Sequence, residues 1–201
     1  MPICQCANGL RCPVGELLEE AAAQGLVYDF FDRERDCAAP VDEPCEAYAV
    51  SVDYGTANPA SFGLWGRRGT VWYRIDEYYY ASRREGKQKT DAEYVEELWH
   101  LLDGRRPDVV VVDPSAASFI EALRRTGLRV QKADNDVLWG IRVTAGMLKE
   151  KKLILCSNCA DCLREMELYC WEEGAVRDVP RKEHDHAMDE MRYFAAYLAQ
   201  Q

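Results

Sequence analysis

The sequence contains no uninterrupted apolar run close to the roughly 18 residues that a membrane-spanning helix needs. Its first ten residues, MPICQCANGL, have no basic region followed by an apolar stretch, so they do not resemble a secretion signal. Without such a signal, the nine cysteines favour reduced thiols or a metal site over a disulfide framework. We therefore expect a cytoplasmic protein that has no membrane partner.

Positive charge is scarce, with 25 lysines and arginines against 35 acids and a net charge of −10. The excess is uneven, because residues 1–47 carry ten acids and three arginines, which leaves −3 for the rest of the chain. A surface that holds a divalent cation on its carboxylates can still meet nucleic acid. Each basic run is also compatible with an ordinary solvated loop. The runs are Arg67 and Arg68; Arg83, Arg84, Lys87 and Lys89; and Lys149, Lys151 and Lys152.

The length of 201 residues, of which 48% are hydrophobic, is enough for one well-buried core and a tail. Residues 1–46 are rich in acids and proline toward their end, which is typical of a linker or the tail of a preceding module. From residue 47 the sequence pattern changes to stretches in which apolar and polar residues alternate and β-branched residues are frequent. We expect residues 47–201 to form a single folded domain.

Periodicity predicts a mixed α/β fold over this domain. Residues 47–80 indicate a three-stranded antiparallel meander, with a turn at Gly66–Gly69. Thr90 and Glu93 have the spacing of a capping box ahead of a helix. The run DVVVVD at 108–113 indicates a central parallel strand with both faces covered. Further helices are expected near 115–126, 136–151, 159–172 and 185–200, and further strands at 128–133 and 153–156.

Two acids stand at the ends of predicted strands. Asp53 closes the first strand, and Asp113 closes the run of valines. If these strands are neighbours in one sheet, the two carboxylates meet at one edge. Their repulsion is relieved by a cation between them, and Mg²⁺ or Mn²⁺ suits hard oxygen ligands. Taken singly, each aspartate is also a common turn former or helix cap.

The segment EHDHAMDEMRYF crowds charged groups at the entrance of the last predicted helix. Asp185 and Asp189 are four residues apart and therefore share a helix face, and His186 is three residues from Asp189. These side chains are candidates to complete the metal site. Spacing does not decide which of the two aspartates faces the cation. We favour Asp189, because Asp185 sits where a helix cap is expected.

Four ordered stretches together resemble the C-terminal nuclease domain of phage terminase large subunits, which has a ribonuclease H-like fold. They are VDYGTANPASFGLWG, VVVDPSAASFIEALRRTG, ADNDVLWGIRVTAGML and HDHAMDEMRYF. The resemblance extends over about residues 26–200, and GLVYDFF is similar to the linker that leaves the ATPase domain of this family. The phosphate loop G-x-x-x-x-G-K-[ST] is absent from the sequence, so the packaging motor is missing. The chain is then a nuclease fragment of a longer protein or a prophage remnant.

The resemblance implies a metal-dependent endonuclease that cuts concatemeric double-stranded DNA during genome packaging. By motif position, Asp53, Asp113 and Asp189 are the catalytic, metal-binding acids, and Asp185 and His186 are additional candidate ligands. Two ions, Mg²⁺ or Mn²⁺, act in such a reaction. Possible partners are the portal protein, the small terminase subunit and a terminase ATPase domain. The alternatives are a related ribonuclease H-like nuclease, such as a junction resolvase, or a degenerate docking module that does not cut.

Two further groups bear on binding. We expect the DNA backbone to contact the second and third basic runs: Arg83, Arg84, Lys87, Lys89, Lys149, Lys151 and Lys152. Cys156, Cys159 and Cys162 have a spacing that can bind zinc or an iron–sulfur cluster. Three-residue steps on a helix turn successive thiols away from one another, however, which favours a packing role for them.

Overall fold

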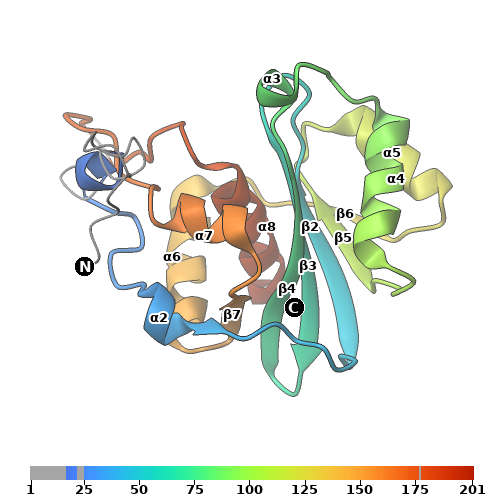
Figure 1. Cartoon of the computed structure of the whole chain (residues 1–201), viewed down its shortest axis with the longest axis horizontal. Helices are drawn as coiled ribbons and strands as arrows, with labels where there is room; N and C mark the ends of the chain where they lie inside the picture. The colour runs from blue at the N-terminus through green and yellow to red at the C-terminus, as the bar shows by residue number, and fades with distance from the viewer. Residues whose placement is uncertain (1–16, 22–24, 177) are drawn as a thin grey trace, which may run out of the picture.

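The computed structural model describes residues 17–21, 25–176 and 178–201. Within them a seven-stranded mixed sheet has the order β1-β7-β4-β3-β2-β5-β6. Helices α4 and α5 cover one face, and α6, α7 and α8 cover the other (Figure 1). The predicted fold class, a mixed sheet with an antiparallel meander flanked by helices, is confirmed. The elements are α2 (Arg33–Asp36), β1 (Cys37–Ala38), β2 (Ala47–Asp53), β3 (Ala60–Arg68), β4 (Val71–Tyr80), α3 (Ser82–Glu85), α4 (Asp91–Leu102), β5 (Val109–Val112), α5 (Ala117–Arg125), β6 (Val130–Lys132), α6 (Val137–Lys149), β7 (Leu153–Cys156), α7 (Ala160–Met166) and α8 (His186–Ala199).

The meander consists of β2, β3 and β4, each antiparallel to the next. Its second turn is not at residues 66–69, as predicted, but at Gly69 and Thr70, because Arg68 still pairs with Val71. Gly69 has φ of +62°, which a glycine adopts without the steric cost that a Cβ brings. The polar character of Arg67 and Arg68 suggested a turn, but both belong to the outer end of β3.

Strand β5 lies between β2 and β6 and is parallel to both. All four of its valines are buried, as the continuous apolar run predicts for a strand covered on both faces. The pairing of Val52 with Val112 sets the register of β2 against β5. The carboxyl ends of these two strands therefore lie at the same edge of the sheet.

The N-termini of two helices carry side-chain caps, of which the sequence indicates the first. Thr90 accepts a hydrogen bond from the backbone N–H of Glu93, and Glu93 in turn accepts one from Thr90, which completes the predicted capping box. Asp136 accepts a bond from the N–H of Trp139 at the start of α6. No helix among the described residues combines the length and apolar character that crossing a bilayer requires.

Helix α7 is shorter than the predicted 159–172. It ends at Met166, because the backbone near Cys170 turns away to pair with residues 25–27. Val27 donates to the carbonyl of Tyr169, and Trp171 donates to that of Gly25. Strand β1 pairs with β7, so part of the segment before residue 47 joins the sheet. The boundary between residues 46 and 47 stays a prediction.

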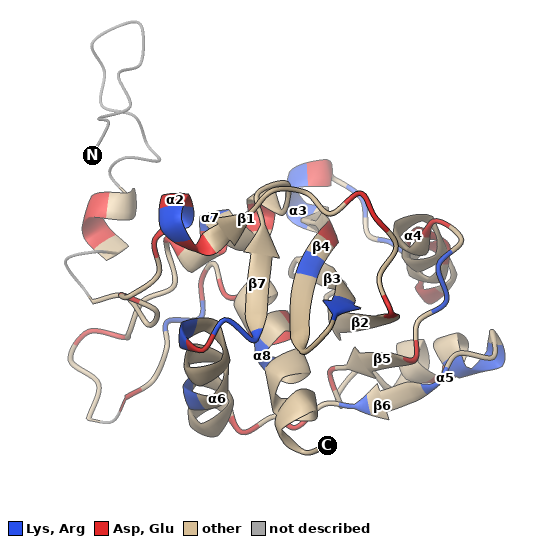
Figure 2. Ribbon diagram, turned by 90° about the horizontal axis from the view of Figure 1, so that it is seen from below, with Lys and Arg blue, Asp and Glu red and all other residues tan. Residues whose placement is uncertain are grey.

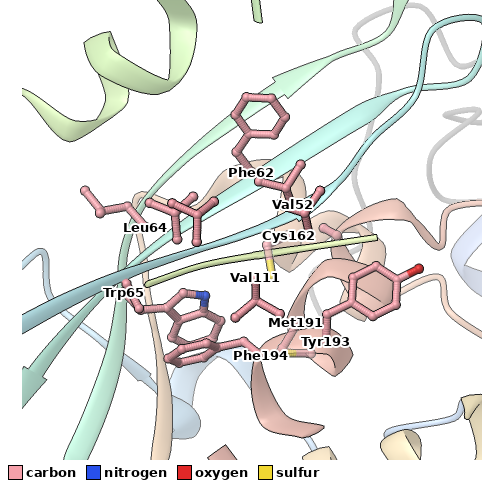
Figure 3. Packing of buried hydrophobic residues seen from close by; sticks show 14 of the residues in the cluster. Val52, Phe62, Leu64, Trp65, Val111, Cys162, Met191, Tyr193 and Phe194 are labelled. Atoms are coloured by element: carbon pink, nitrogen blue, oxygen red, sulfur yellow. The ribbon is translucent and has the colours of Figure 1, made fainter. Parts of the chain in front are cut away.

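Helix α8 packs across the middle of the sheet. Its side chain Phe194 stacks on Trp65 of β3, with ring centroids 4.6 Å apart (Figure 3). Met191 lies beside them, and Val111 of β5 faces the same layer. Residues 187–196 of α8 are all buried, including the charged Asp189, Glu190 and Arg192. This packing fixes the position of the helix that carries the candidate site residues.

Candidate functional site

Two aspartates stand side by side where β2 and β5 end. Asp53 is the last residue of β2, and Asp113 follows β5 directly. The backbone N–H of Asp113 donates to the carbonyl oxygen of Val52 at 3.1 Å, which extends the parallel pairing to this point. Asp113 also closes a local turn, because its carboxylate accepts bonds from the N–H and the hydroxyl of Ser115. Asp113 is therefore both a turn former and a residue of the sheet edge.

These two acids line an open hollow of about 650 Å³. The N-terminal turn of α8 and the residue before it supply Asp185, His186 and Asp189 to the same hollow. All five predicted metal-site residues thus meet at one edge of the sheet. Further lining comes from residues 54–59 after β2 and from Asn135, Val137, Lys182 and Tyr193.

His186 and Asp53 form the pair that joins α8 to β2. The His186 Nδ1 atom lies 2.9 Å from Asp53 Oδ2. Burial raises the pKa of Asp53 to about 6 against the opposing effect of His186, and the charges of Asp189 and Asp113 add to the rise. Burial lowers the pKa of His186, but the hydrogen bond and charge of Asp53 outweigh it and the net pKa is raised.

Asp189 is tied on both sides. Its Oδ1 accepts from Nε and Nη2 of Arg192, at 3.2 and 3.0 Å, and its Oδ2 lies 3.3 Å from the ammonium of Lys182. The same ammonium lies 3.3 Å from Oδ2 of Asp185. Lys182 therefore bridges the two acids between which the sequence could not decide.

Asp185 does not cap α8 through its side chain. It occupies the N-cap position, as expected, but makes no side-chain cap hydrogen bond. Glu165 of α7 serves this end of the helix instead, because its Oε2 accepts a bond of 2.6 Å from the N–H of Ala187. The N-cap position of Asp185 therefore gives no reason to prefer Asp189, because the carboxylate of Asp185 lines the hollow with Lys182 beside it, and the choice between the two acids stays a prediction.

Among the residues of the hollow that sequence reasoning did not predict, three lie outside the turn after β2 and carry polar groups: Lys182, Asn135 and Tyr193. Lys182 is three positions before Asp185, and this closeness in sequence was the available signal. Asn135 lies in the stretch ADNDVLWG, which supports the resemblance but predicts no role for this residue. Tyr193 belongs to the amphipathic pattern of the last helix, and it lines the hollow all the same.

The basic residues expected to contact DNA fall into two separate groups (Figure 2). The group at 83–89 follows the end of β4, which runs in the same direction as β2, so it shares the edge with the acids. A second hollow of about 310 Å³ is lined there by Arg83, Lys87 and their neighbours, and both hollows include Ala57. Within this group Arg84, Lys87 and Lys89 pair with Glu85, Glu93 and Glu97.

The group at 149–152 lies at the opposite edge, because it precedes β7, which runs parallel to β4. Lys151 pairs with Asp36, Lys152 pairs with Glu150, and Lys149 lies 4.3 Å from the centre of the Phe30 ring. The structure does not bring these lysines to the acids. Contact of both groups with a single short stretch of DNA at the hollow is therefore disfavoured by the fold.

The donor set suits a hard divalent cation, because four carboxylates and one imidazole line the hollow, and crowding of the acids contributes to the raised pKa of Asp53. As they stand, no three histidine, cysteine or acidic side chains of the described ranges are gathered closely enough to hold an ion. One oxygen of Asp53 faces His186, one oxygen of Asp189 faces Arg192, and Lys182 lies against the other oxygen of Asp189 and against Asp185. A cation that binds these acids would have to displace Lys182 from them.

Cys156, Cys159 and Cys162 are buried, and burial raises the pKa of all three thiols. Cys159 Sγ lies 3.3 Å from the carbonyl oxygen of Arg74. A protonated, buried thiol is a packing residue rather than a ready metal ligand.

Comparison with known proteins finds several that are similar to this chain. No protein-family model matches it. The terminase large subunit of Escherichia phage T5 is 27% identical over 128 residues, which cover 60% of this chain and 29% of that protein. The large terminase of a thermophilic bacteriophage, solved in complex with ADP, has a TM-score of 0.85 and 44% identity, over 88% of this chain and 46% of that one. This chain thus spans less than half the length of both relatives.

Two solved nuclease domains share the fold along nearly their whole length. The P22 large terminase nuclease domain has a TM-score of 0.70 at 15% identity, over 87% of this chain and 93% of that one. The large terminase nuclease of the thermophilic phage G20c, solved with bound cobalt, has a TM-score of 0.63 at 14% identity, over 87% and 97%. The resemblance that the sequence motifs indicate is confirmed: the chain is similar to the nuclease domain of phage terminase large subunits, and its fold is ribonuclease H-like.

Proposed function

We propose that this chain is a divalent-metal-dependent endodeoxyribonuclease and that the hollow between β2, β5 and α8 is its active site. The observation that carries the proposal is the convergence of Asp53, Asp113, Asp185 and Asp189, from three elements far apart in sequence, on one open hollow. Carboxylates crowded at one place repel one another, and a metal that binds them offsets this repulsion. The similarity of this chain to the P22 large terminase nuclease domain supports the same function.

Asp53 and Asp113 are the proposed metal ligands from the strands. Asp189 or Asp185, together with His186, is the proposed contribution of α8. When bound, two ions of Mg²⁺ or Mn²⁺ would supply activation of the attacking water and stabilisation of the leaving 3′-oxygen. His186 keeps Asp53 oriented through Nδ1. The cobalt in the G20c nuclease supports the use of a divalent ion.

The proposed substrate is double-stranded DNA, cut as concatemers during genome packaging in a bacterial host. Arg83 and Lys87 line the hollow that adjoins the acids through Ala57, which makes them the nearest candidates to hold backbone phosphates. With few cations in reach, binding to DNA should be weak and salt-sensitive. Tethering to a terminase ATPase domain, the portal protein or the small terminase subunit would raise the local concentration of DNA.

The test is nicking of supercoiled plasmid by the purified chain in Mn²⁺ or Mg²⁺, with cation binding measured by calorimetry. We expect nicking by the wild type and its loss in Asp53→Asn and in Asp113→Asn, because each change removes a proposed ligand. Asp103→Asn is the control, since Asp103 is an exposed residue in the left-handed region, which asparagine tolerates.

If the wild type binds no divalent cation and leaves the plasmid intact at high concentration, the nuclease proposal fails and a docking module is the better reading. Preferential cutting of four-way junctions over plasmid would instead identify a junction resolvase. Equal loss of nicking in Asp103→Asn would show that the effect is not specific to the hollow.

A further inference from the structure

Arg192 is 1% exposed and lies in the middle of α8. Its Nε and Nη2 donate to Asp189 Oδ1, and Nη2 also donates to Asn135 Oδ1 at 3.2 Å. Asp189 and Asn135 both line the hollow, whereas Arg192 itself lies behind them. One guanidinium thus joins the helix that carries the candidate acids to the residue that precedes the N-cap of α6.

A glycine of α6 provides the space for this arginine. A Cβ atom added to Gly140 would lie 2.5 Å from Cγ and 2.8 Å from Cδ of Arg192, well inside van der Waals contact. These carbons are close to the α8 backbone, so they cannot swing aside as a flexible side-chain tip does. Gly140 is buried within α6, where glycine is otherwise about 1 kcal/mol less favourable than alanine.

The buried pair of Arg192 and Asp189 stabilises the packing of α6 and α8 less than apolar side chains would. A buried ion pair contributes little stability compared with apolar residues of the same volume, because both charges lose their hydration. Here the Nη1 atom of Arg192 is buried without a hydrogen-bond partner among the described residues, which adds to the cost. Arg192 instead fixes orientation, since a planar guanidinium holds the acceptor side chains that it binds in one geometry.

The orientation of Asn135 follows from this contact. Arginine has donors alone, so the amide oxygen of Asn135 must be the atom that faces it. Its amide nitrogen is then left as a donor at the hollow, where a phosphate oxygen of DNA can accept.

We propose that Arg192 is a positioning residue that holds Asp189 and Asn135 toward the hollow. Gly140 leaves the space that the Cγ and Cδ atoms of Arg192 occupy. The proposal rests on the nuclease function proposed above and assigns to that site one residue that fixes a candidate metal ligand and a second residue, Asn135, that contacts substrate.

The experiment compares Gly140→Ala with Gly146→Ala in the same helix. At Gly146 an added Cβ meets nothing within 4 Å, so alanine there should leave Mn²⁺ binding and nicking unchanged. Gly140→Ala should displace Arg192. We expect its kcat for plasmid nicking to fall at least tenfold and its Kd for Mn²⁺, measured by calorimetry, to rise severalfold.

A double variant separates positioning from packing. Gly140→Ala with Arg192→Ala removes the collision, so its thermal unfolding midpoint should recover toward that of the wild type. Mn²⁺ affinity and kcat should stay low, because the guanidinium is gone. Arg192→Lys keeps the charge but loses the planar set of guanidinium donors, so it should also lower kcat. This variant replaces Gly140→Ala in the experiment if Gly140→Ala does not fold.

The positioning role is overturned if Gly140→Ala behaves as Gly146→Ala does, or if the double variant regains Mn²⁺ affinity and nicking together with its stability. A wild type that neither binds Mn²⁺ nor nicks plasmid would instead remove the proposed nuclease function, and the positioning role with it. The wild-type measurement therefore distinguishes failure of the positioning role from failure of the nuclease function.

Discussion

Glu165 accepts a hydrogen bond of 2.6 Å from the backbone N–H of Ala187, and so a residue of α7 caps the first turn of α8. Its other carboxylate oxygen accepts a bond of 2.6 Å from the hydroxyl of Tyr79 on β4. One buried side chain thereby ties the sheet, α7 and α8 together. The consequence for the site is that Asp185, relieved of capping, can face the hollow.

Glu165→Ala should destabilise the protein by about 2 kcal/mol, since it leaves a helix N–H and a tyrosine hydroxyl without their acceptor. Urea unfolding monitored by circular dichroism measures the change. Glu167→Ala is the matched control, because Glu167 lies at the half-exposed C-cap of α7 and should change stability by less than about 0.5 kcal/mol. Similar losses in both variants would contradict the capping role.

A second prediction concerns the buried pair of Arg74 and Glu190. Arg74 Nη1 contacts Glu190 Oε2, Ser51 donates to the other oxygen, and both charged side chains are 0% exposed. The pair lies against Gly63 of β3, where a Cβ would collide with both partners. Arg74→Met or Glu190→Leu alone should cost about 3–5 kcal/mol, because the first leaves the buried Glu190 without its cation and the second leaves Arg74 with Glu77, 3.3 Å away, as its remaining ion-pair partner.

The double variant Arg74→Met with Glu190→Leu should cost clearly less than the sum of the single changes. Equilibrium unfolding of all four proteins gives this coupling free energy. Strict additivity would mean that the two side chains do not stabilise each other.

Lys182 offers a third prediction. Its ammonium lies 3.3 Å from a carboxylate oxygen of Asp185 and of Asp189, so it is an internal cation at the proposed metal site. Lys182→Ala should strengthen Mn²⁺ binding, by roughly threefold to tenfold at low salt, because it removes a competing positive charge. Calorimetry at low and high salt measures the affinity. Lys152→Ala, at the opposite edge, should leave it unchanged, and weaker binding in Lys182→Ala would contradict the competition.

The fourth prediction is a pH dependence at the start of α4. The ammonium of Lys87, followed by the cap hydrogen bonds from Thr90, lowers the pKa of Glu93 from 4.5 to about 2. A carboxyl whose folded pKa is depressed contributes stability above its unfolded pKa and loses that contribution as pH falls through the folded value. The stability difference between wild type and Glu93→Gln should thus be present at pH 7 and shrink as pH falls below about 4.5.

Urea unfolding at several pH values tests this difference. Glu96→Gln is the control for the removal of one negative charge, because Glu96 is exposed on the same helix and is no part of the capping box. A difference that grows on acidification would reverse the sign and contradict the assignment.

Patterns local in sequence predicted most of the fold. The alternation in residues 47–80, the buried run at 109–112 and the capping box at Thr90 each depend on a few neighbouring residues, and each is present in the structure. Apart from the turn predicted at residues 66–69, the errors arose where distant segments intervene. Strand β1 has two residues and no periodicity, and α7 ends early because residues 25–27 take the hydrogen bonds of the chain beyond it.

The candidate site divides in the same way. Topology brings Asp53 and Asp113 together, and strand ends are visible in sequence. The partners of the α8 acids depend instead on how far side chains reach and on which helix lies behind them. Asn135 and Arg192 acquire their positions through such contacts, and no spacing rule indicates them, whereas the closeness of Lys182 to Asp185 in sequence was a signal.

The contact of His186 with Asp53 joins residues 133 positions apart. During translation, α8 leaves the ribosome after every strand of the sheet, so a nascent chain holds its strand-end aspartates well before it has the helix that faces them. Long-range contacts of this kind form late and slowly. A chain interrupted before α8 would lack His186 and Asp189, so under the nuclease function proposed above it would have an incomplete metal site and would not cut DNA.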